Sequence, residues 1–225
     1  MWLILAFCSA ALLGFYDVCK KHALSGNAVL PVLFLNTAIC SLLFLPFIIL
    51  SSYTGLLDSS SFYVEPCGWE QHRYILLKAC IVLSSWIFGY FAMKHLPITI
   101  VGPINATRPV MVLVGALLVF GERLNVWQWA GVTLAIISFF LLKRSGKKEG
   151  VDFRHNKWIF SLILAAVLGA VSGLYDKYLM APPENGGVGL SRMVVQSWYN
   201  LYQLAMMGLT MLMIWWPTRK KSTPF

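Results

Sequence analysis

Charged residues are scarce in this chain. Asp, Glu, Lys and Arg together make up 12% of its 225 residues, against 58% hydrophobic residues, and the mean hydropathy is +0.70. A domain with a fully solvated surface needs a more polar composition, so a water-soluble globular protein is excluded.

Residues that build disulfide, metal or catalytic sites are also few and dispersed. Four of the five cysteines fall in or at the ends of apolar runs, and only Cys67 lies in a loop, so no disulfide framework is expected. The four histidines are scattered over loops and segment ends, which predicts no metal site. No glycine-rich phosphate loop and no Ser-His-Asp spacing occur either. We therefore expect no cofactor and no enzymatic activity.

Long apolar runs dominate what is present. A helix needs about 20 apolar residues to cross the hydrocarbon core, because its backbone polar groups must pair within the segment. Seven segments meet this rule: Trp2 to Lys20, Val29 to Ser51, Tyr74 to Met93, Ile98 to Phe120, Val126 to Leu142, Trp158 to Leu179 and Met193 to Trp216. We expect an all-α, polytopic integral membrane protein of the plasma membrane, which is the inner membrane in a bacterium.

The chain repeats itself. The segment LILAFCSAALLGFYD (3–17) aligns with LILAAVLGAVSGLYD (162–176) with eight identities in fifteen positions, including an ungapped Gly-x-Tyr-Asp. The next segment continues the match after a loop five residues longer, so that Asn36 falls on Asn200. We interpret this as internal duplication.

The duplication predicts the domain organisation. Residues 1–143 form a first five-helix repeat, 144–157 a basic linker, and 158–225 the first two helices of a second repeat. We expect a complete protein to have ten spans, of which this chain carries seven.

Basic residues predict how the repeats are oriented. If the loops after the first, third, fifth and seventh spans share a side, that side holds twelve Lys and Arg, and the other side holds Arg73, Arg123 and Arg192. This bias places the N-terminus outside the cytoplasm. Because five spans is an odd number, the second repeat is expected to be inverted. The formal net charge of +9 is then a topology signal, and nucleic acid is not expected as a partner.

The repeated Tyr-Asp pairs are candidate functional residues. Inverted repeats with polar residues inside the spans are the architecture of secondary transporters. Asp17 and Asp176 are candidate proton carriers, because burial of a carboxyl group favours its protonated form. The alternative is that Asp17 pairs with Lys21 at i,i+4 and that Asp176 lies at the membrane interface beside Lys177. Tyr16 and Tyr175 are either substrate contacts or interfacial anchors.

The segment GPINATRP (102–109) contains Arg108, a charged residue inside a predicted span. Arg108 lies about ten residues into its span, where an unpaired guanidinium is costly. Pro103 and Pro109 each remove a backbone donor and loosen the helix. Arg108 and Asn105, which share one face, are predicted to grip a carboxylate or phosphate. The alternative is a structural pair between Arg108 and one of the two aspartates.

Other polar and aromatic residues inside spans are weaker candidates. Asn36, Gln196 and Asn200 are either substrate ligands or hydrogen-bonding links between helices. Gln196, Asn200 and Gln203 form one stripe. Trp86 forms either an aromatic wall with Tyr90 or plain packing. Glycines 14 and 173, each in a small-xxx-small pair, are expected to let helices approach closely. Lys78 is expected to extend its amine to the interface.

Residues 88–142 resemble the EamA-type branch of the drug/metabolite transporter superfamily. The shared features are the proline-containing span, the turn Gly121-Glu122-Arg123-Leu124 and a glycine-containing last span. The resemblance covers the first repeat and the front of the second. It implies ten helices in two inverted repeats around a central cavity, and export or exchange of small metabolites. Many relatives keep both termini in the cytoplasm, which differs from the orientation that the basic residues predict.

Three functions compete at this stage. We expect a secondary carrier of a small polar or anionic metabolite, with the substrate and the lipid bilayer as partners and a homodimer as a further option. A non-transporting membrane fragment or assembly factor is the alternative. A membrane-embedded enzyme is disfavoured, because it would need clustered catalytic groups.

Overall fold

The computed structural model describes residues 2–121, 123, 125–146 and 155–218, and this part of the chain is helical, with no strands. The helices are α1 (Trp2–Leu24), α2 (Val29–Tyr53), α3 (Trp69–His95), α4 (Ile98–Ala106), α5 (Arg108–Phe120), α6 (Val126–Gly146), α7 (Lys157–Met180), α8 (Arg192–Thr210) and α9 (Trp216–Thr218). A π-helical turn, Met211–Trp215, joins α8 to α9, and short 3₁₀ turns lie at Gly55–Leu57 and Pro183–Asn185. The all-α class is confirmed.

Each predicted span corresponds to helical structure. The helices α1 and α6 end four residues later than predicted, and two differences are larger. The helix α3 begins at Trp69, five residues before the predicted start, and the fourth span is divided into α4 and α5. Within the described residues, α2, α3, the combined α4–α5 segment and α7 are long and apolar enough to cross a membrane. The count of seven spans stays a prediction.

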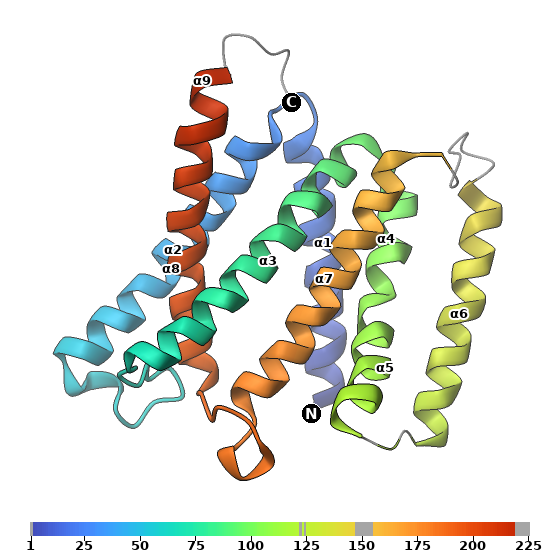
Figure 1. Cartoon of the computed structure of the whole chain (residues 1–225). Coiled ribbons are helices and arrows are strands. Elements are labelled where there is room, and N and C mark those ends of the chain that lie inside the picture. Colours follow the sequence, from blue (N-terminus) through green and yellow to red (C-terminus); the bar gives the residue numbers. More distant parts are fainter. Residues whose placement is uncertain (1, 122, 124, 147–154, 219–225) are drawn as a thin grey trace.

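The long helices alternate in direction along the chain when α4 and α5, which run the same way, are taken as one segment. In Figure 1, α1 and α3 run upward while α2 and α7 run downward, so α1 and its sequence counterpart α7 are antiparallel. The upper end of the bundle therefore receives the last turns of α1 and α3, which carry Lys21 and Lys94, and the first residue of α7, Lys157. This is the side that the charge bias assigns to the cytoplasm. The inverted repeat itself remains a prediction.

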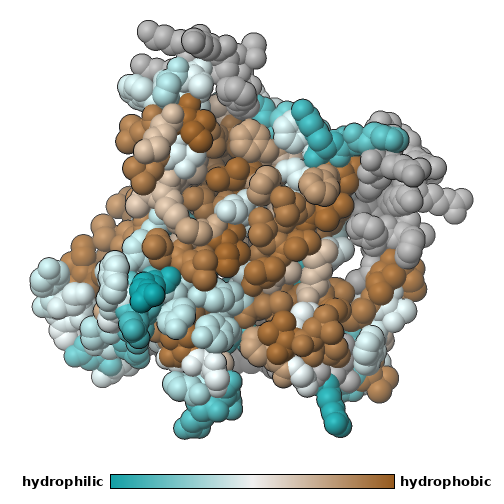
Figure 2. All heavy atoms as spheres, in the orientation of Figure 1, coloured by the Kyte–Doolittle hydropathy of each residue, from teal (hydrophilic) through white to brown (hydrophobic). Residues whose placement is uncertain are grey.

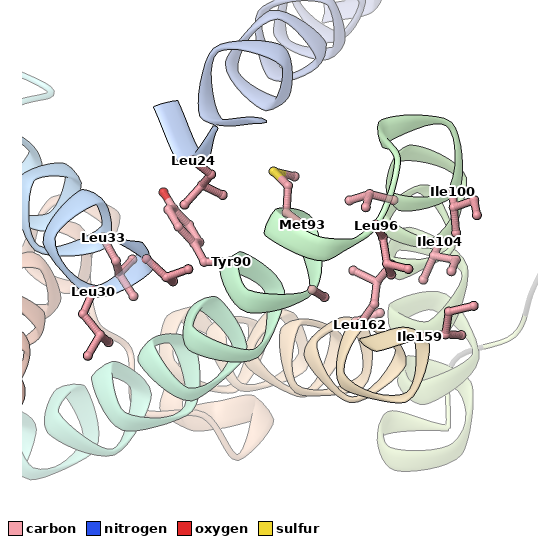
Figure 3. Packing of buried hydrophobic residues seen from close by; sticks show 14 of the residues in the cluster. Leu24, Leu30, Leu33, Tyr90, Met93, Leu96, Ile100, Ile104, Ile159 and Leu162 are labelled. Atoms are coloured by element: carbon pink, nitrogen blue, oxygen red, sulfur yellow. The ribbon is translucent and has the colours of Figure 1, made fainter. Parts of the chain in front are cut away.

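Two apolar clusters hold the bundle together at its two ends. The upper cluster joins the ends of α1 and α3 to the starts of α2, α4 and α7. Figure 3 shows Leu24, Leu33 and Tyr90 together on one side of the end of α3, and Ile104 and Leu162 on the other. The lower cluster joins the end of α2 and the start of α3 to the end of α7 and the start of α8, and includes Ile75, Leu179 and Tyr199. The helix pair α3 and α7 makes the most extensive contact of the structure.

The outer surface fits a lipid environment. Figure 2 shows hydrophobic residues over the middle of the visible face and hydrophilic ones gathered at its lower edge and upper right. Large apolar side chains such as Phe7, Leu12 and Phe160 are more than two-thirds exposed. Exposed apolar area of this extent would be unfavourable in water but is favourable in hydrocarbon.

Glycines allow α5 and α7 to approach closely. A Cβ at Gly173 would lie 3.1 Å from Val112 Cγ2, and a Cβ at Gly115 would meet the end of the Leu174 side chain. The close-approach role expected of Gly173 is therefore met in this structure. A Cβ at its counterpart Gly14 would contact nothing within 4 Å among the described residues, because Gly14 lines a cavity. The close approach expected at Gly14 is therefore not found.

This difference gives a stability prediction. Gly173→Ala should lower the free energy of unfolding by about 1–2 kcal/mol, because the β-branched Val112 cannot easily move away. Thermal unfolding of the purified protein in detergent measures the effect. Gly131→Ala on α6 is the matched control: its Cβ would meet none of the described atoms within 4 Å, so it should be neutral or stabilising by up to about 1 kcal/mol. Equal melting temperatures for the two variants would contradict the packing argument.

Cys67 reports on orientation. It lies in the loop between α2 and α3, which is external if the N-terminus is external. Partial burial, together with the Glu65 carboxylate, raises the pKa of the Cys67 thiol. In a variant that keeps only this cysteine, a membrane-impermeant maleimide added to intact cells should label it, and faster at about pH 9 than at about pH 7, because the thiolate is the reactive form. Labelling only after the cells are permeabilised would contradict the predicted orientation in the plasma membrane.

Candidate binding cavity

The interruption between α4 and α5 places polar groups inside the bundle. Pro109 has no N–H, so the carbonyl of Asn105 loses its helical donor four residues on. The residue between the helices, Thr107, donates its side-chain hydroxyl to the Ile104 carbonyl at 2.7 Å. The helix α5 then begins at Arg108, which brings the guanidinium and the positive end of the helix dipole together.

A cavity of about 530 Å³ lies next to this interruption. It is formed by α1, α3, α4 and α5, which belong to the first predicted repeat. Its lining includes Ala10, Leu13, Gly14, Tyr16, Asp17, Lys20, Ser85, Trp86, Gly89, Tyr90, Met93, Gly102, Asn105, Ala106, Arg108 and Pro109. The structure thus gathers Tyr16, Asp17, Trp86, Asn105 and Arg108, five of the residues singled out in the sequence, around one space.

The cavity carries one negative and two positive side chains. Lys20 Nζ lies 2.8 Å from Asp17 Oδ1, and Arg108 is close enough to interact electrostatically with both groups. The alternative in which Asp17 pairs with Lys21 is wrong, since the partner is Lys20. Lys21 instead donates to the carbonyls of Met93 at 2.6 Å and Leu96 at 2.8 Å, where it caps the end of α3. The remaining charge of the cavity lining is positive.

Arg108 has hydrogen-bonding capacity to spare. Its Nε is buried and has no hydrogen-bond partner in the part of the chain that the structure describes, and the same holds for Asn105 Oδ1. The guanidinium packs over Gly169 of α7: a Cβ there would lie 3.1 Å from Arg108 Cζ and 3.2 Å from Nε. The glycine therefore leaves room for the guanidinium between α5 and α7. A buried donor and a buried acceptor without partners can bind a polar ligand.

Aromatic rings cover the side of the cavity next to α1 and α3. The hydroxyls of Tyr16 and Tyr90 are 3.0 Å apart, and Lys20 Nζ lies 4.8 Å and 5.2 Å from the centres of these two rings. Trp86 lines the same space one turn before Tyr90. Asn36 of α2 lies near Tyr16, but its amide nitrogen has no hydrogen-bond partner among the described residues. Asn36 is not part of the cavity lining.

The amides of α8 lie in its contact with α2. Asn200 is buried, its Nδ2 donates to the Gln196 carbonyl at 2.8 Å, and its own carbonyl accepts from Ser41 Oγ at 2.7 Å. Gln196 Nε2 donates to the Tyr199 hydroxyl at 3.3 Å. The bonds of the Gln196 and Asn200 side chains both lie within α8, and only the bond from Ser41 to the backbone carbonyl of Asn200 links α8 to α2. The choice between substrate binding and links between helices stays open for these two amides. Gln203 is different: it is buried and neither amide atom has a partner in the described structure.

Tyr175 lies away from the cavity. Its hydroxyl donates to the Tyr74 carbonyl at 3.2 Å, and its ring stacks on Tyr178 with the ring centres 5.9 Å apart. This aromatic group covers the lower part of the contact between α3 and α7. The position fits the anchoring alternative better than the substrate contact.

Lys78 is the residue for which the sequence-based prediction is wrong. It is buried at 6% exposure, forms a salt bridge with Asp176 of α7, and holds its Nζ 4.6 Å from the centre of the Tyr199 ring. It cannot extend to the interface, because α3 begins five residues earlier than predicted and Lys78 therefore lies deeper in the bundle. The alternative for Asp176, a position at the membrane interface beside Lys177, did not include this ion pair with Lys78.

Asp176 also lines a second cavity, of about 840 Å³, at the lower end of α7 and the start of α8. Lys177, Ser191 and Arg192 line it as well. No group of three His, Cys, Asp or Glu side chains that could hold a metal ion occurs in the described residues. Of the turn singled out by the family resemblance, Glu122 and Leu124 lie outside those residues; Gly121 has φ +65°, a left-handed conformation that glycine adopts without strain.

Comparisons with known proteins agree with this architecture. The model of the EamA-like transporter family matches residues 1–144. Among curated proteins, UDP-galactose transporter homolog 1 of Kluyveromyces lactis is 23% identical over 84 residues, which are 36% of this chain and 25% of that relative. The matched stretch thus spans a quarter of the relative's length. No solved structure matches.

Proposed function

Because this chain belongs to the EamA-like transporter family, we propose that it is a secondary transporter that carries a small polar or anionic metabolite by alternating access. Membership in this family, together with the apolar helices, makes it a multi-pass integral membrane protein. The substrate class and the mechanism are the parts that we propose.

The proposed substrate class follows from the position of Arg108. Its Nε is buried without a partner among the described residues, it borders a cavity, and its neighbouring carboxylate, Asp17, is already paired with Lys20. A guanidinium presents a planar fork that matches a carboxylate or a phosphate. An anionic group on the substrate would supply the missing acceptor.

The other groups around the cavity suit the remainder of such a molecule. Asn105 Oδ1 offers an acceptor, and the rings of Tyr16, Trp86 and Tyr90 offer apolar faces. Asn36 Nδ2, near Tyr16, is a proposed donor outside the lining. A volume of about 530 Å³ lies within the range of roughly 300–1,000 Å³ that small-molecule sites occupy. Nucleotide sugars combine phosphates with faces that stack on aromatic rings. The name of the yeast relative makes UDP-galactose the first compound to test.

Alternating access is proposed from the inverted repeat. The antiparallel course of α1 and α7 (Figure 1) supports a rocking of one half against the other. Asp17 and Asp176 are the proposed proton carriers. The plasma membrane is the proposed location, with the N-terminus outside.

A transport assay tests the proposal. The purified protein, reconstituted in liposomes, is offered radiolabelled UDP-galactose, sugar phosphates, carboxylates and amino acids, with and without a pH gradient. We expect saturable uptake of at least one anionic compound, stimulated by unlabelled compound inside the liposomes. Uptake no greater than that of protein-free liposomes across the whole panel would reject the transporter in favour of the alternative, a membrane fragment or assembly factor without transport.

A further inference from the structure

The ion pair between Lys78 and Asp176 connects parts of the chain that the duplication assigns to different repeats. Lys78 lies on α3 in the first repeat and Asp176 on α7 in the second, and these helices form the most extensive contact of the structure. Around them is the lower apolar cluster, which includes Ile75, Leu179 and Tyr199. We call the contact between α3 and α7 the seam. Burying an ion pair among apolar side chains costs desolvation free energy, so an ion pair in the seam suggests a functional role.

The two partners differ in their access to water. The Lys78 side chain is 7% exposed, whereas that of Asp176 is 29% exposed and lines the cavity of about 840 Å³. Among the described residues, the charged or titratable groups near Asp176 are Lys78 on α3, Tyr199 and Arg192 on α8, and Lys177 and Tyr178 on α7. A proton can therefore reach the carboxylate from the cavity while Lys78 stays enclosed between the helices.

The corresponding carboxylate of the first repeat is placed differently. Asp17 pairs with Lys20 on its own helix, one turn away. Loss of that pair would separate no two helices, because both partners belong to α1. Among the two carboxylates in equivalent positions, only Asp176 makes an ion pair between helices in the described structure.

We infer that Lys78 and Asp176 form the proton-coupling pair of this transporter, and that proton uptake by Asp176 opens the seam between α3 and α7. The inference rests on the proposed function and selects Asp176 over Asp17. The proton forms one O–H bond on the carboxylate, and Lys78 keeps its ammonium group, now without an anionic partner. A buried ammonium in that state is unfavourable. Water relieves it, and water reaches Lys78 when α3 and α7 separate.

Thiol accessibility at the seam tests the opening without knowledge of the substrate. Ser172 lies one turn before Asp176 on α7 and is 7% exposed, so Ser172→Cys introduces a nearly isosteric reporter. In a background with the five native cysteines replaced by serine, N-ethylmaleimide labels this thiol at a rate set by opening of the seam. Asp176→Asn, which mimics the protonated carboxyl, should increase the rate by at least about tenfold.

Two controls separate opening from misfolding. The double replacement Lys78→Met with Asp176→Leu removes both charges, so its labelling rate should return to that of the parent. Asp17→Asn removes the ion pair within α1 and should leave the rate unchanged. A rate in Asp176→Asn within about twofold of the parent, or an equal increase in Asp17→Asn, would overturn the inference.

Transport by the reconstituted protein tests the coupling. The probe is radiolabelled UDP-galactose, or else the panel compound with the strongest saturable uptake. Asp176→Asn should lose accumulation driven by a pH gradient and keep exchange of external for internal compound. Retention of gradient-driven accumulation by Asp176→Asn, or by the double variant, would overturn the coupling role. If the parent protein carries no compound at all, the proposed function fails by itself, and the labelling rates alone decide whether the pair controls the seam.

Discussion

Replacement of Arg108 by alanine is expected to reduce transport by roughly a hundredfold in kcat/KM, which corresponds to about 3 kcal/mol of lost interaction with an anionic substrate. No carboxylate among the described residues forms a salt bridge with the Arg108 guanidinium. Its removal leaves Lys20, which is already paired with Asp17. The measurement is the initial rate of uptake in proteoliposomes over a range of substrate concentrations.

Two further variants sharpen this prediction. Arg108→Lys keeps the charge but loses the planar fork, so it should recover only part of the activity. Arg73→Ala removes an exposed arginine near the start of α3 and should behave like the parent protein. Full activity in Arg108→Ala, with the protein folded and inserted, would remove Arg108 from the binding site. It would favour a structural role, in which the guanidinium packs against Gly169.

Single removal of either partner of the buried ion pair is expected to cause the largest loss of stability. Lys78→Met leaves Asp176 without its cation, and Asp176→Leu leaves the ammonium of Lys78 in the lower apolar cluster. Each should lower the free energy of unfolding by about 3–5 kcal/mol, because an uncompensated buried charge remains. Lys78→Met leaves the more exposed partner, so its loss should be the smaller of the two.

The double variant gives the diagnostic comparison. With both charges replaced by apolar side chains of similar size, the unfolding free energy should lie within about 1 kcal/mol of the parent protein, or above it. Thermal or denaturant unfolding in detergent provides the measurement for all three variants. Additive losses in the double variant would show that the two side chains contribute independently, contrary to the ion-pair geometry.

The helices were predictable because a helix that crosses a membrane needs a long run of apolar residues. Apolar runs such as Val29 to Ser51 and Trp158 to Leu179 end where polar or loop-forming residues begin, and α2 and α7 extend at most two residues beyond those limits. The start of α3 was placed too late because Trp69 to Arg73 is polar. That stretch is nonetheless helical: Gln71 Oε1 accepts from the Gly68 N–H at 2.8 Å, and this bond starts the helix ahead of the apolar run.

The sequence predicted those residues of the candidate site whose placement inside a membrane span costs free energy. Arg108, Asp17 and Asn105 stand out because charge and unpaired amides inside a span require a reason. Lys20 was missed as part of the cavity, although its spacing of three from Asp17 was a usable signal. Gly169 forms the small-xxx-small pair with Gly173, but its contact with the Arg108 guanidinium depends on how α5 crosses α7.

The amino-acid sequence alone determined the membrane class, the approximate positions of the helices and the family resemblance, and it predicts the duplication, because these depend on local composition and on matches along the chain. Tertiary structure decided which polar residues meet. Asp17 and Asp176 occupy equivalent positions in the repeat, yet one pairs within its own helix and the other with a lysine of α3. Their partners differ because α7 is packed against α3 and α5 while α1 makes few contacts with other helices, and ion pairs between helices depend on that packing.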